Sequence, residues 1–411
     1  MHNLALPCKA TLRNGVPLYI IEGGTQDVVR IDMLMSGGYG VQKMPLQALF
    51  TNRMLREGTK DFSSAEIARR LDYYGAWIDM YSSQNCNHLT LYTLGRHVEP
   101  LLELVDSMLR RPLFPQKNLN TVRGSNKAFF KINSRKVDVV AQRHFEHTLW
   151  GEAHPLGHIV EERDYDAITQ ESLMQYHAQV YGSNTLSLFL SGKINEKIMM
   201  AIERVMGTDT WGTDRRIQFI TPQTAVPTYG CKKVHMDGAL QSGVKIGFMA
   251  MDSDDADYLR FRFLTVLLGG YFGSRLMSNI REKNGYTYHI EAELDAYGKK
   301  NAFMISTETD NAYVEPLLKE VDYEISRLRN ESVSSEELEL VRNYTLGELC
   351  REYEGVMPKA EVFINAWLSG QPFDIVNDYL GIVRSVTAEE LKSLAGKYLH
   401  SDCFSTVIVG A

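Results

Sequence analysis

The chain has 411 residues, 44 basic against 51 acidic side chains, and a formal net charge of −7. A hydrophobic fraction of 44% and a charged fraction of 23% are typical of a soluble globular protein, which excludes disordered, collagen-like and mini-protein classes. The acidic balance lacks the basic surface expected of a nucleic-acid-binding protein. No apolar run reaches the roughly 18 residues of a membrane span, and a length prior of about 150 residues per domain predicts two or three domains.

The first residues and the cysteines indicate the compartment. Residues 1–7 contain neither a basic segment nor a long apolar segment, so no secretory signal is predicted and a cytoplasmic location is expected. No Cys-x-x-Cys pair occurs, which favours reduced thiols over a redox or thiolate-zinc site. The five scattered cysteines are Cys8, Cys86, Cys231, Cys350 and Cys403.

Strands and helices are both predicted in the first half. Residues 28–35 (VVRIDMLM) and 87–94 (NHLTLYTL) are predicted strands, and the alternation in the second predicts that it is half-buried. Residues 98–109 place apolar side chains at helical spacing and predict a helix. Thr169 is a predicted helix start, and residues 186–190 are a predicted strand.

The chain repeats itself once. Residues 97–106 read HVEPLLELVD and residues 313–322 read YVEPLLKEVD, an offset of 216 positions. Residues 167–192 and 385–410 form a second similar pair, with an offset of 218 positions. Two matches with nearly the same offset, far apart in the chain, predict a tandem duplication of units of roughly 170–200 residues. Two domains are therefore expected instead of three.

The second unit repeats the predicted order of elements. Residues 244–251 (VKIGFMAM) and 406–409 are predicted strands, and Thr387 is a predicted helix start. Strands and helices in this order predict an α+β fold, in which each unit is a mostly antiparallel sheet with helices packed on one face.

The boundary between the two units is predicted from composition. Residues 207–228 are rich in Gly, Thr, Asp and Pro and show no sustained period, which is typical of a linker. The predicted domains are therefore residues 1–206 and 229–411.

The segment after the first predicted strand resembles the opening of a pitrilysin/insulinase-type (M16) zinc metallopeptidase. In that family a glycine-bearing turn precedes a helix carrying His-x-x-Glu-His, and a Met-Leu-x-x-Gly-Thr segment follows. Here residues 54–59 read MLREGT, and residues 154–157 (HPLG) match a later segment of the family. The resemblance extends across the whole chain and implies the short-chain bacterial type.

The zinc motif itself is degenerate. In the family two histidines four residues apart bind Zn²⁺, the intervening glutamate is the base, and a further glutamate about 75 residues downstream completes the ligands. Aligned on MLREGT, the motif positions hold Leu49, Asn52 and Arg53, and the downstream glutamate falls at residues 128–130 (AFF). A guanidinium cannot hold Zn²⁺. This chain is therefore predicted to bind no metal and to contain no catalytic residue. Arg53 is interpreted either as a solvated helix residue or as an occupant of the former metal cavity.

A group of histidines offers an alternative metal site. Its candidate ligands are His144, His147, His154, His158, Glu161 and Glu162. The first two histidines are three residues apart, and a proline and a glycine between the next two argue against one continuous helix face. Ordinary histidines are the favoured interpretation, and a metallopeptidase with a non-standard site is kept as an alternative.

The second half keeps a different signature of the family. Residues 269–290 read GGYFGSRLMSNIREKNGYTYHI and match its C-terminal segment. Arg281 and Tyr288 match the Arg/Tyr pair that contacts the substrate backbone near the scissile bond in active members. Arginine supplies several fixed donors and tyrosine one hydroxyl, which suit peptide carbonyls and a developing oxyanion. Arg275, Asn279 and Glu282 are interpreted as helix surface or packing.

The resemblance therefore implies an asymmetric pattern. The first half lacks the zinc ligands of the family, and the second half keeps the residues that contact the substrate. Some bacterial members pair two short chains, one carrying His-x-x-Glu-His and the other Arg/Tyr, around a chamber where peptides add to a sheet edge. The preferred hypothesis is a non-catalytic, substrate-binding subunit of a heteromeric zinc peptidase whose partner chain supplies the zinc. A scaffold protein without peptidase role, like respiratory-complex core subunits of similar sequence, and a homodimer in isolation stay open.

Overall fold

The computed structural model describes residues 3–212 and 229–410. In the first half the strands are β1 (Cys8–Thr11), β2 (Pro17–Glu22), β3 (Val28–Ser36), β4 (Trp77–Ser82), β5 (Cys86–Leu94) and β6 (Leu186–Gly192). The helices are η1 (Gly38–Val41), α1 (Gln47–Met54), η2 (Leu55–Glu57), α2 (Ser64–Tyr74), η3 (Gly95–His97), α3 (Val98–Arg110), α4 (Gln116–Asn133), α5 (Val137–Trp150), α6 (Glu162–Ala167), α7 (Gln170–Val180) and α8 (Glu196–Met206).

The second half repeats this arrangement. Its strands are β7 (Gly230–His235), β8 (Gln241–Met249), β9 (Thr287–Tyr297), β10 (Lys300–Asp310) and β11 (Ser405–Gly410). Its helices are α9 (Tyr258–Gly269), η4 (Met277–Lys283), η5 (Asn311–Tyr313), α10 (Val314–Asn330), α11 (Ser335–Tyr353), α12 (Val356–Leu368), α13 (Ile375–Ser385), α14 (Ala388–Tyr398) and η6 (Ser401–Cys403).

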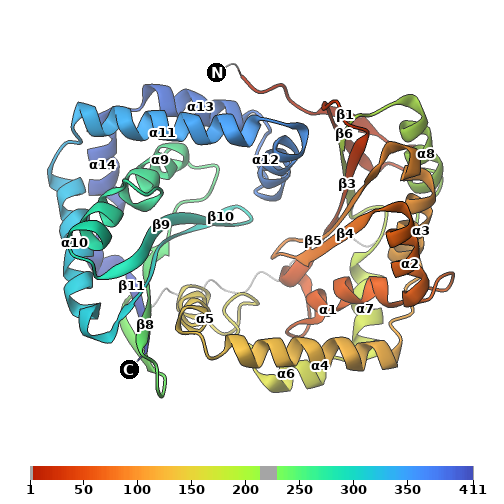
Figure 1. Cartoon of the computed structure of the whole chain (residues 1–411), viewed down its shortest axis with the longest axis horizontal. Helices are drawn as coiled ribbons and strands as arrows, with labels where there is room; N and C mark the ends of the chain where they lie inside the picture. Colours follow the sequence, from red (N-terminus) through yellow and green to blue (C-terminus); the bar gives the residue numbers. More distant parts are fainter. Residues whose placement is uncertain (1–2, 213–228, 411) are drawn as a thin grey trace.

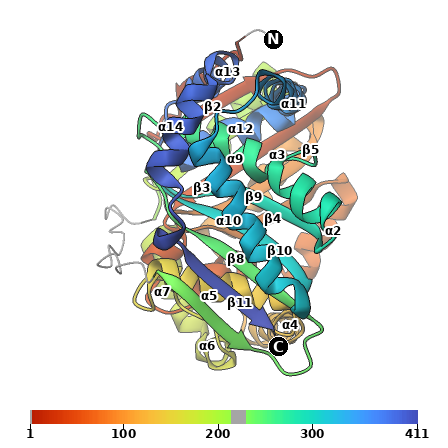
Figure 2. The same cartoon turned by 90° about the vertical axis from the view of Figure 1, so that its left-hand side faces the viewer.

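The two halves build two sheets with the same plan. Within the described ranges, the first sheet has the order β1-β2-β6-β3-β5-β4 and the second has the order β7-β11-β8-β10-β9. The pairs β2–β6 and β7–β11 are parallel, whereas the other neighbours are antiparallel. Helices cover the outward side of each sheet, and the two sheets stand on opposite sides of the molecule (Figure 1). Figure 2 shows α10 and α14 in front of the second sheet. The predicted α+β class with mostly antiparallel sheets is confirmed.

The elements expected from sequence are present with shifted ends. Strands β3 and β6 and helix α3 cover the predicted segments and extend them slightly, whereas β8 ends two residues before the predicted segment does. Thr169 and Thr387 are the N-caps of α7 and α14, and each forms a capping box with the third residue of its helix. The hydroxyl of each threonine accepts a hydrogen bond from a backbone N–H that the helix itself cannot satisfy.

One burial prediction is wrong. Strand β5 was expected to be half-buried, yet its polar side chains are enclosed as fully as its apolar ones: His88 is 1% exposed and Leu89 is 0% exposed. The polar side chains are enclosed by neighbours in the same half: the ring of His88 stacks on Tyr81, and the hydroxyl of Thr90 donates to Asp32. A sequence pattern reports the polarity of a face and not what packs upon it.

The two halves exchange a helix. Helix α5, from the first half of the sequence, packs on β8 and β11 of the second sheet, and α12 of the second half packs on β2 and β6 of the first sheet. Phe145 and Leu149 of α5 are buried in a cluster with Met304 and Val407 of the second sheet. On the first sheet, Phe189 lies edge-on to Trp367 of α12, with ring centroids 6.3 Å apart. Each sheet therefore has helices on its outward face and one exchanged helix on its inward face.

A buried cation on the central strand of each sheet pairs with the exchanged helix. The guanidinium of Arg30 on β3 lies 2.6 Å from the carboxylate of Glu361 on α12 and also donates to Asp32. Likewise, the ammonium of Lys245 on β8 lies 2.7 Å from the carboxylate of Asp138 on α5. Both pairs join the central strand to the exchanged helix, although the sheet register places Lys245 at the equivalent of Asp32 and not of Arg30.

The predicted linker is described only in part, since residues 213–228 of the segment 207–228 lie outside the described residues. The domain boundaries therefore stay a prediction. No helix of the described part is long and apolar enough to cross a membrane.

Candidate functional site

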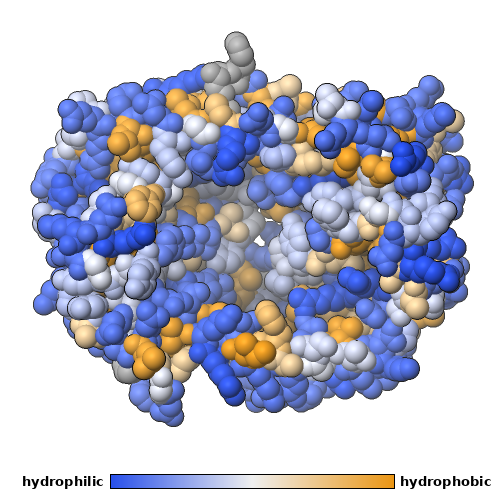
Figure 3. Space-filling view, in the orientation of Figure 1, coloured by the Kyte–Doolittle hydropathy of each residue, from blue (hydrophilic) through white to orange (hydrophobic). Residues whose placement is uncertain are grey.

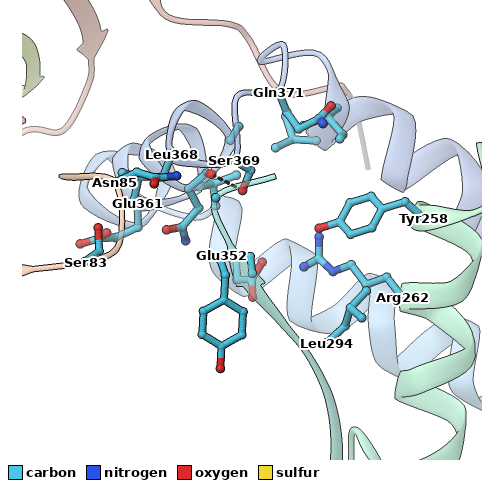
Figure 4. A pocket seen from close by; sticks show the side chains of 18 of the residues that line it. Ser83, Asn85, Tyr258, Arg262, Leu294, Glu352, Glu361, Leu368, Ser369 and Gln371 are labelled. Atoms are coloured by element: carbon cyan, nitrogen blue, oxygen red, sulfur yellow. Dashed lines mark hydrogen bonds between the residues drawn. The ribbon is translucent and has the colours of Figure 1, made fainter. Parts of the chain in front are cut away.

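A cavity of about 1080 Å³ lies between the two halves. It is lined by Arg30 and Tyr39 of the first half and by Arg262, Leu294 and Glu352 of the second. Figure 3 shows the hollow in the centre of this face, and Figure 4 shows Arg262 and Glu352 pointing into the cavity. Because both halves supply its walls, the cavity exists only when the two sheets face each other.

The tips of two hairpins meet beside this cavity. The turn between β4 and β5 carries Asn85, and the turn between β9 and β10 carries Gly298 with a φ of +67°. A Cβ atom built on Gly298 would lie 2.1 Å from the side-chain nitrogen of Asn85. Only glycine combines this backbone conformation with so close an approach. Both tips line the cavity, so their contact fixes part of its wall.

A second cavity of about 430 Å³ lies between α9, η4 and β9. Arg281 lines it together with Phe272 and Gly269. A Cβ atom on Gly269 would lie 2.4 Å from the backbone nitrogen of Ala292, so glycine allows β9 to approach the end of α9. Arg262 and Leu294 line both cavities, which places them where the two cavities meet.

Arg281 stands near the end of the π-helix η4, an element that is rare and frequently found at functional sites. Its guanidinium carbon lies 4.5 Å from the centre of the Phe272 ring. This cation–π contact orients the side chain without using its N–H donors. Arg275 and Asn279, by contrast, are buried and bond to Glu337 and Glu324, which confirms their interpretation as packing residues.

Tyr288 is 88% exposed at the start of β9. The register between β9 and β10 shifts between Thr307 and Thr309, so that Tyr288 and His289 together oppose a single residue of β10. The hydroxyl of Thr307 donates to the carbonyl of His289 at 2.7 Å and holds this bulge in place. Bulges re-aim side chains, and here the result is a tyrosine directed away from the core.

Strand β9 is an edge strand, because β10 is its one neighbour in the described second sheet. Its carboxylates Glu291, Glu293 and Asp295 alternate along the strand and so share one face. Burial, followed by the charges of Asp295 and Glu291, raises the pKa of Glu293 from 4.5 to about 7. An unpaired strand edge beside an arginine and a tyrosine is suited to an extended peptide.

The positions of the degenerate zinc motif lie on α1, in the first half. Asn52 is 1% exposed, and its amide nitrogen donates to the carbonyls of Tyr81 at 2.7 Å and His88 at 3.0 Å. Asn52 therefore joins α1 to the adjacent ends of β4 and β5. Leu49 is half-buried and Arg53 is exposed, which favours the solvated interpretation of Arg53.

The predicted downstream ligand position also lacks a metal-binding side chain. Residues 128–130 lie on α4, where Ala128 is exposed and Phe129 is 66% exposed. The aromatic ring of Phe130 instead contacts Tyr165 at 5.3 Å between centroids. An alanine and two phenylalanines supply no oxygen or nitrogen ligand for Zn²⁺.

The alternative histidine group is engaged in local structure. His147 and His158 bond through ring nitrogens to the carbonyl of Gly157 at 2.8 Å and the carboxylate of Asp164 at 2.9 Å. The ring of His154 stacks on Trp150 with centroids 4.4 Å apart. Residues 3–212 and 229–410 contain no group of three or more His, Cys, Asp and Glu side chains arranged to hold a metal ion.

Sequence reasoning missed Arg262. It lies on α9 in an otherwise apolar run (YLRFRFLTVLLG), and only the fold reveals that it faces the junction of the cavities. The available signal was the charge itself, because a cation inside such a run needs either a partner or water.

A family model described as the M16 peptidase inactive domain matches residues 167–344. An uncharacterized zinc protease of Rickettsia felis is 20% identical over 403 residues, which cover 97% of this chain and 96% of the relative. A non-peptidase homolog of Helicobacter pylori is 22% identical over 378 residues, which cover 89% of this chain and 84% of the relative.

A solved structure has the same fold. The crystal structure of a peptidase M16 inactive domain from Pseudomonas fluorescens superposes with a TM-score of 0.86, covers 98% of both chains and is 22% identical. The predicted resemblance to the M16 peptidase family is thus confirmed, with the inactive-domain model matching residues 167–344 and relatives similar along most of the chain.

Proposed function

We propose that this M16-type chain is the non-catalytic, substrate-binding subunit of a heteromeric zinc peptidase. The observation that carries the proposal is the contrast between two sites. Arg281 and Tyr288 present their polar groups away from the core, whereas Asn52, at the former position of the base, is used in internal hydrogen bonds. A side chain that contributes little to the fold and still projects from a fixed backbone is suited to contact a ligand.

The chemistry of the two side chains fits a peptide backbone. The guanidinium of Arg281 can donate two N–H groups to a peptide carbonyl, and the hydroxyl of Tyr288 can donate one. In a peptidase, the carbonyl of the scissile bond gains negative charge as water attacks, and such donors stabilise that charge. The Phe272 ring orients the Arg281 side chain in advance and the bulge sets the backbone at Tyr288, which lowers the entropy cost of binding.

The catalytic metal belongs to the partner in this proposal. The partner chain carries His-x-x-Glu-His and supplies zinc, which activates the attacking water. The present chain contributes the edge of β9 for the substrate backbone and the two donors near its start. The partner's identity and the peptide's sequence are left to experiment.

Co-purification of the chain from its native source, followed by kinetics on the complex, tests the proposal. We expect Arg281→Ala to lower kcat/KM about 100-fold and Tyr288→Phe about tenfold, because each removes a donor that acts in the transition state. The matched control is Arg69→Ala, which removes an exposed arginine from α2 and should leave kcat/KM unchanged.

Unchanged kinetics for Arg281→Ala in an active complex would contradict the proposal and favour a scaffold role. The proposal assigns the zinc to the partner chain. It would therefore also be contradicted if the isolated chain bound one equivalent of zinc and cleaved peptides without a partner.

A further inference from the structure

Arg262 is the cation at the junction of the two cavities. It projects from α9 and lines both the 430 Å³ cavity that contains Arg281 and the 1080 Å³ cavity between the halves. Its side chain is exposed to this interior space, and Figure 4 shows the guanidinium beside Tyr258 and facing the hollow. A ligand that extends from one cavity into the other must pass it.

The protein holds this guanidinium in position. Its central carbon lies 4.2 Å from the centre of the Tyr379 ring, and Tyr379 is itself buried on α13. Stacking on a fixed ring orients the planar group while its N–H donors stay in the plane, free to bond. Arg262 is therefore arranged in advance for an acceptor.

That acceptor is missing from the described protein. Among residues 3–212 and 229–410, no carboxylate forms a hydrogen bond or an ion pair within 4.0 Å with Arg262, although Glu352 lines the same cavity. Two residues earlier on the same helix, Arg260 is paired with Glu390 at 3.1 Å. Burial lowers the pKa of Arg262, but Tyr379, Tyr258 and Glu352 raise it more, so the side chain remains charged.

The surroundings make an anionic acceptor more favourable than water. Leu259, Leu294 and Leu368 are among the apolar residues that line the larger cavity around Arg262. A charge-assisted hydrogen bond in such a setting is stronger than one at the surface, since less water competes for the donor. Guanidinium and carboxylate also match as a pair of parallel hydrogen bonds.

We propose that Arg262 binds a carboxylate of the peptide whose backbone is held at Arg281 and Tyr288, and so selects substrates by that group. The carboxylate comes either from the end of the peptide or from an acidic side chain, and both present the same chemistry. This inference rests on the proposed function. It assigns Arg262 a role in specificity that is separate from the contacts near the scissile bond.

The test uses the full-length chain and four fluorescently labelled decapeptides of one sequence. The first pair differs only at the C-terminus, which is a free carboxylate in one peptide and a carboxamide in the other. The second pair differs only at one residue near the C-terminus, which is glutamate in one peptide and glutamine in the other. In one of the two pairs, we expect the unmodified chain to bind the peptide with the carboxylate about tenfold more tightly than its uncharged counterpart. This is the usual gain from one charge-assisted pair of hydrogen bonds. Arg262→Gln should abolish this preference and Arg262→Lys should keep part of it. Arg260→Gln is the matched control on the same helix and should keep all of it.

The outcomes separate the two proposals. Loss of the acid-over-amide preference in Arg262→Gln identifies the peptide terminus as the source, and loss of the glutamate-over-glutamine preference identifies a side chain. No preference, or one that persists in Arg262→Gln, overturns the inference. If Arg281→Ala still weakens all four peptides equally in that case, the proposed function survives. Absence of binding by every peptide would contradict the proposed function and this inference with it.

Discussion

Helix α1 of the first half and the η4–β9 segment of the second carry the two segments that match family motifs, yet they use their polar groups differently. On α1, Asn52 is fully enclosed and bonded to two strand carbonyls. On the η4–β9 segment, Arg281 rests on one aromatic ring and Tyr288 is almost fully exposed. The first site has become part of the packing, whereas the second retains groups that the fold does not need.

The two equivalent edge strands differ in the same sense. Strand β4 carries Trp77 and Tyr81, whose rings lie against Tyr92 and His88 of β5. By the register of the two sheets, Glu293 of β9 takes the place of Tyr81 and Glu291 that of Asp79, and Asp295 adds a third carboxylate to the same face. Aromatic pairs across strands stabilise a sheet, whereas carboxylates side by side repel one another. The first edge is thus built for stability and the second retains unfavourable charges, which is typical of a functional surface.

The largest effect on stability is expected when the glutamate of the family's zinc motif is restored at position 52. Asn52→Glu should lower the free energy of unfolding by about 3–5 kcal/mol, because a buried carboxylate would face two carbonyl oxygens with only the Tyr181 hydroxyl as a donor. Urea unfolding followed by circular dichroism measures this. The neighbouring exposed residue supplies the control, since Arg53→Glu should change stability by about 0.5 kcal/mol or less. Similar losses in both variants would show that Asn52 has no special structural role.

A smaller effect is expected from the carboxylates of β9. The pKa of Glu293 is about 7 in the folded protein against 4.5 in the unfolded chain, so the folded state holds the proton more tightly. Its stabilising contribution is therefore complete below about pH 4.5 and is lost as the pH rises through 7. We expect the stability of the unmodified chain, relative to Glu293→Gln, to fall by about 1–3 kcal/mol between pH 5 and pH 8. Parallel stability curves for the two proteins would contradict this.

Much of the local fold could be predicted from sequence, because it depends on local physics. The caps at Thr169 and Thr387 and the period of α3 are local signals, and the repeat offset indicated one plan used twice. The exchange of α5 and α12 could not be predicted, because an amphipathic helix does not indicate which sheet its apolar face covers. The close burial of β5 could not be predicted either, because it depends on contacts between strands, such as Tyr81 on His88 and Thr90 on Asp32, that the alternation does not reveal.

The site was predictable where a motif spans adjacent residues. The blank motif on α1 and the pair Arg281 and Tyr288 follow from spacing and resemblance, and their use as substrate contacts stays a proposal. The bulge at Tyr288 depends on Thr307 and Thr309 of β10, whose hydroxyls donate to the carbonyls of His289 and Tyr286 from some twenty residues away. Arg262 likewise acquires its importance from two cavities formed by distant segments.

The central claim is that zinc and substrate contacts are divided between two chains. Metal analysis of the isolated chain, and of the complex it forms in its native source, tests this most directly. The account predicts less than about 0.1 zinc per isolated chain and about one zinc per heteromeric complex, with peptide cleavage confined to the complex. One zinc per isolated chain, with cleavage in the absence of any partner, would contradict it.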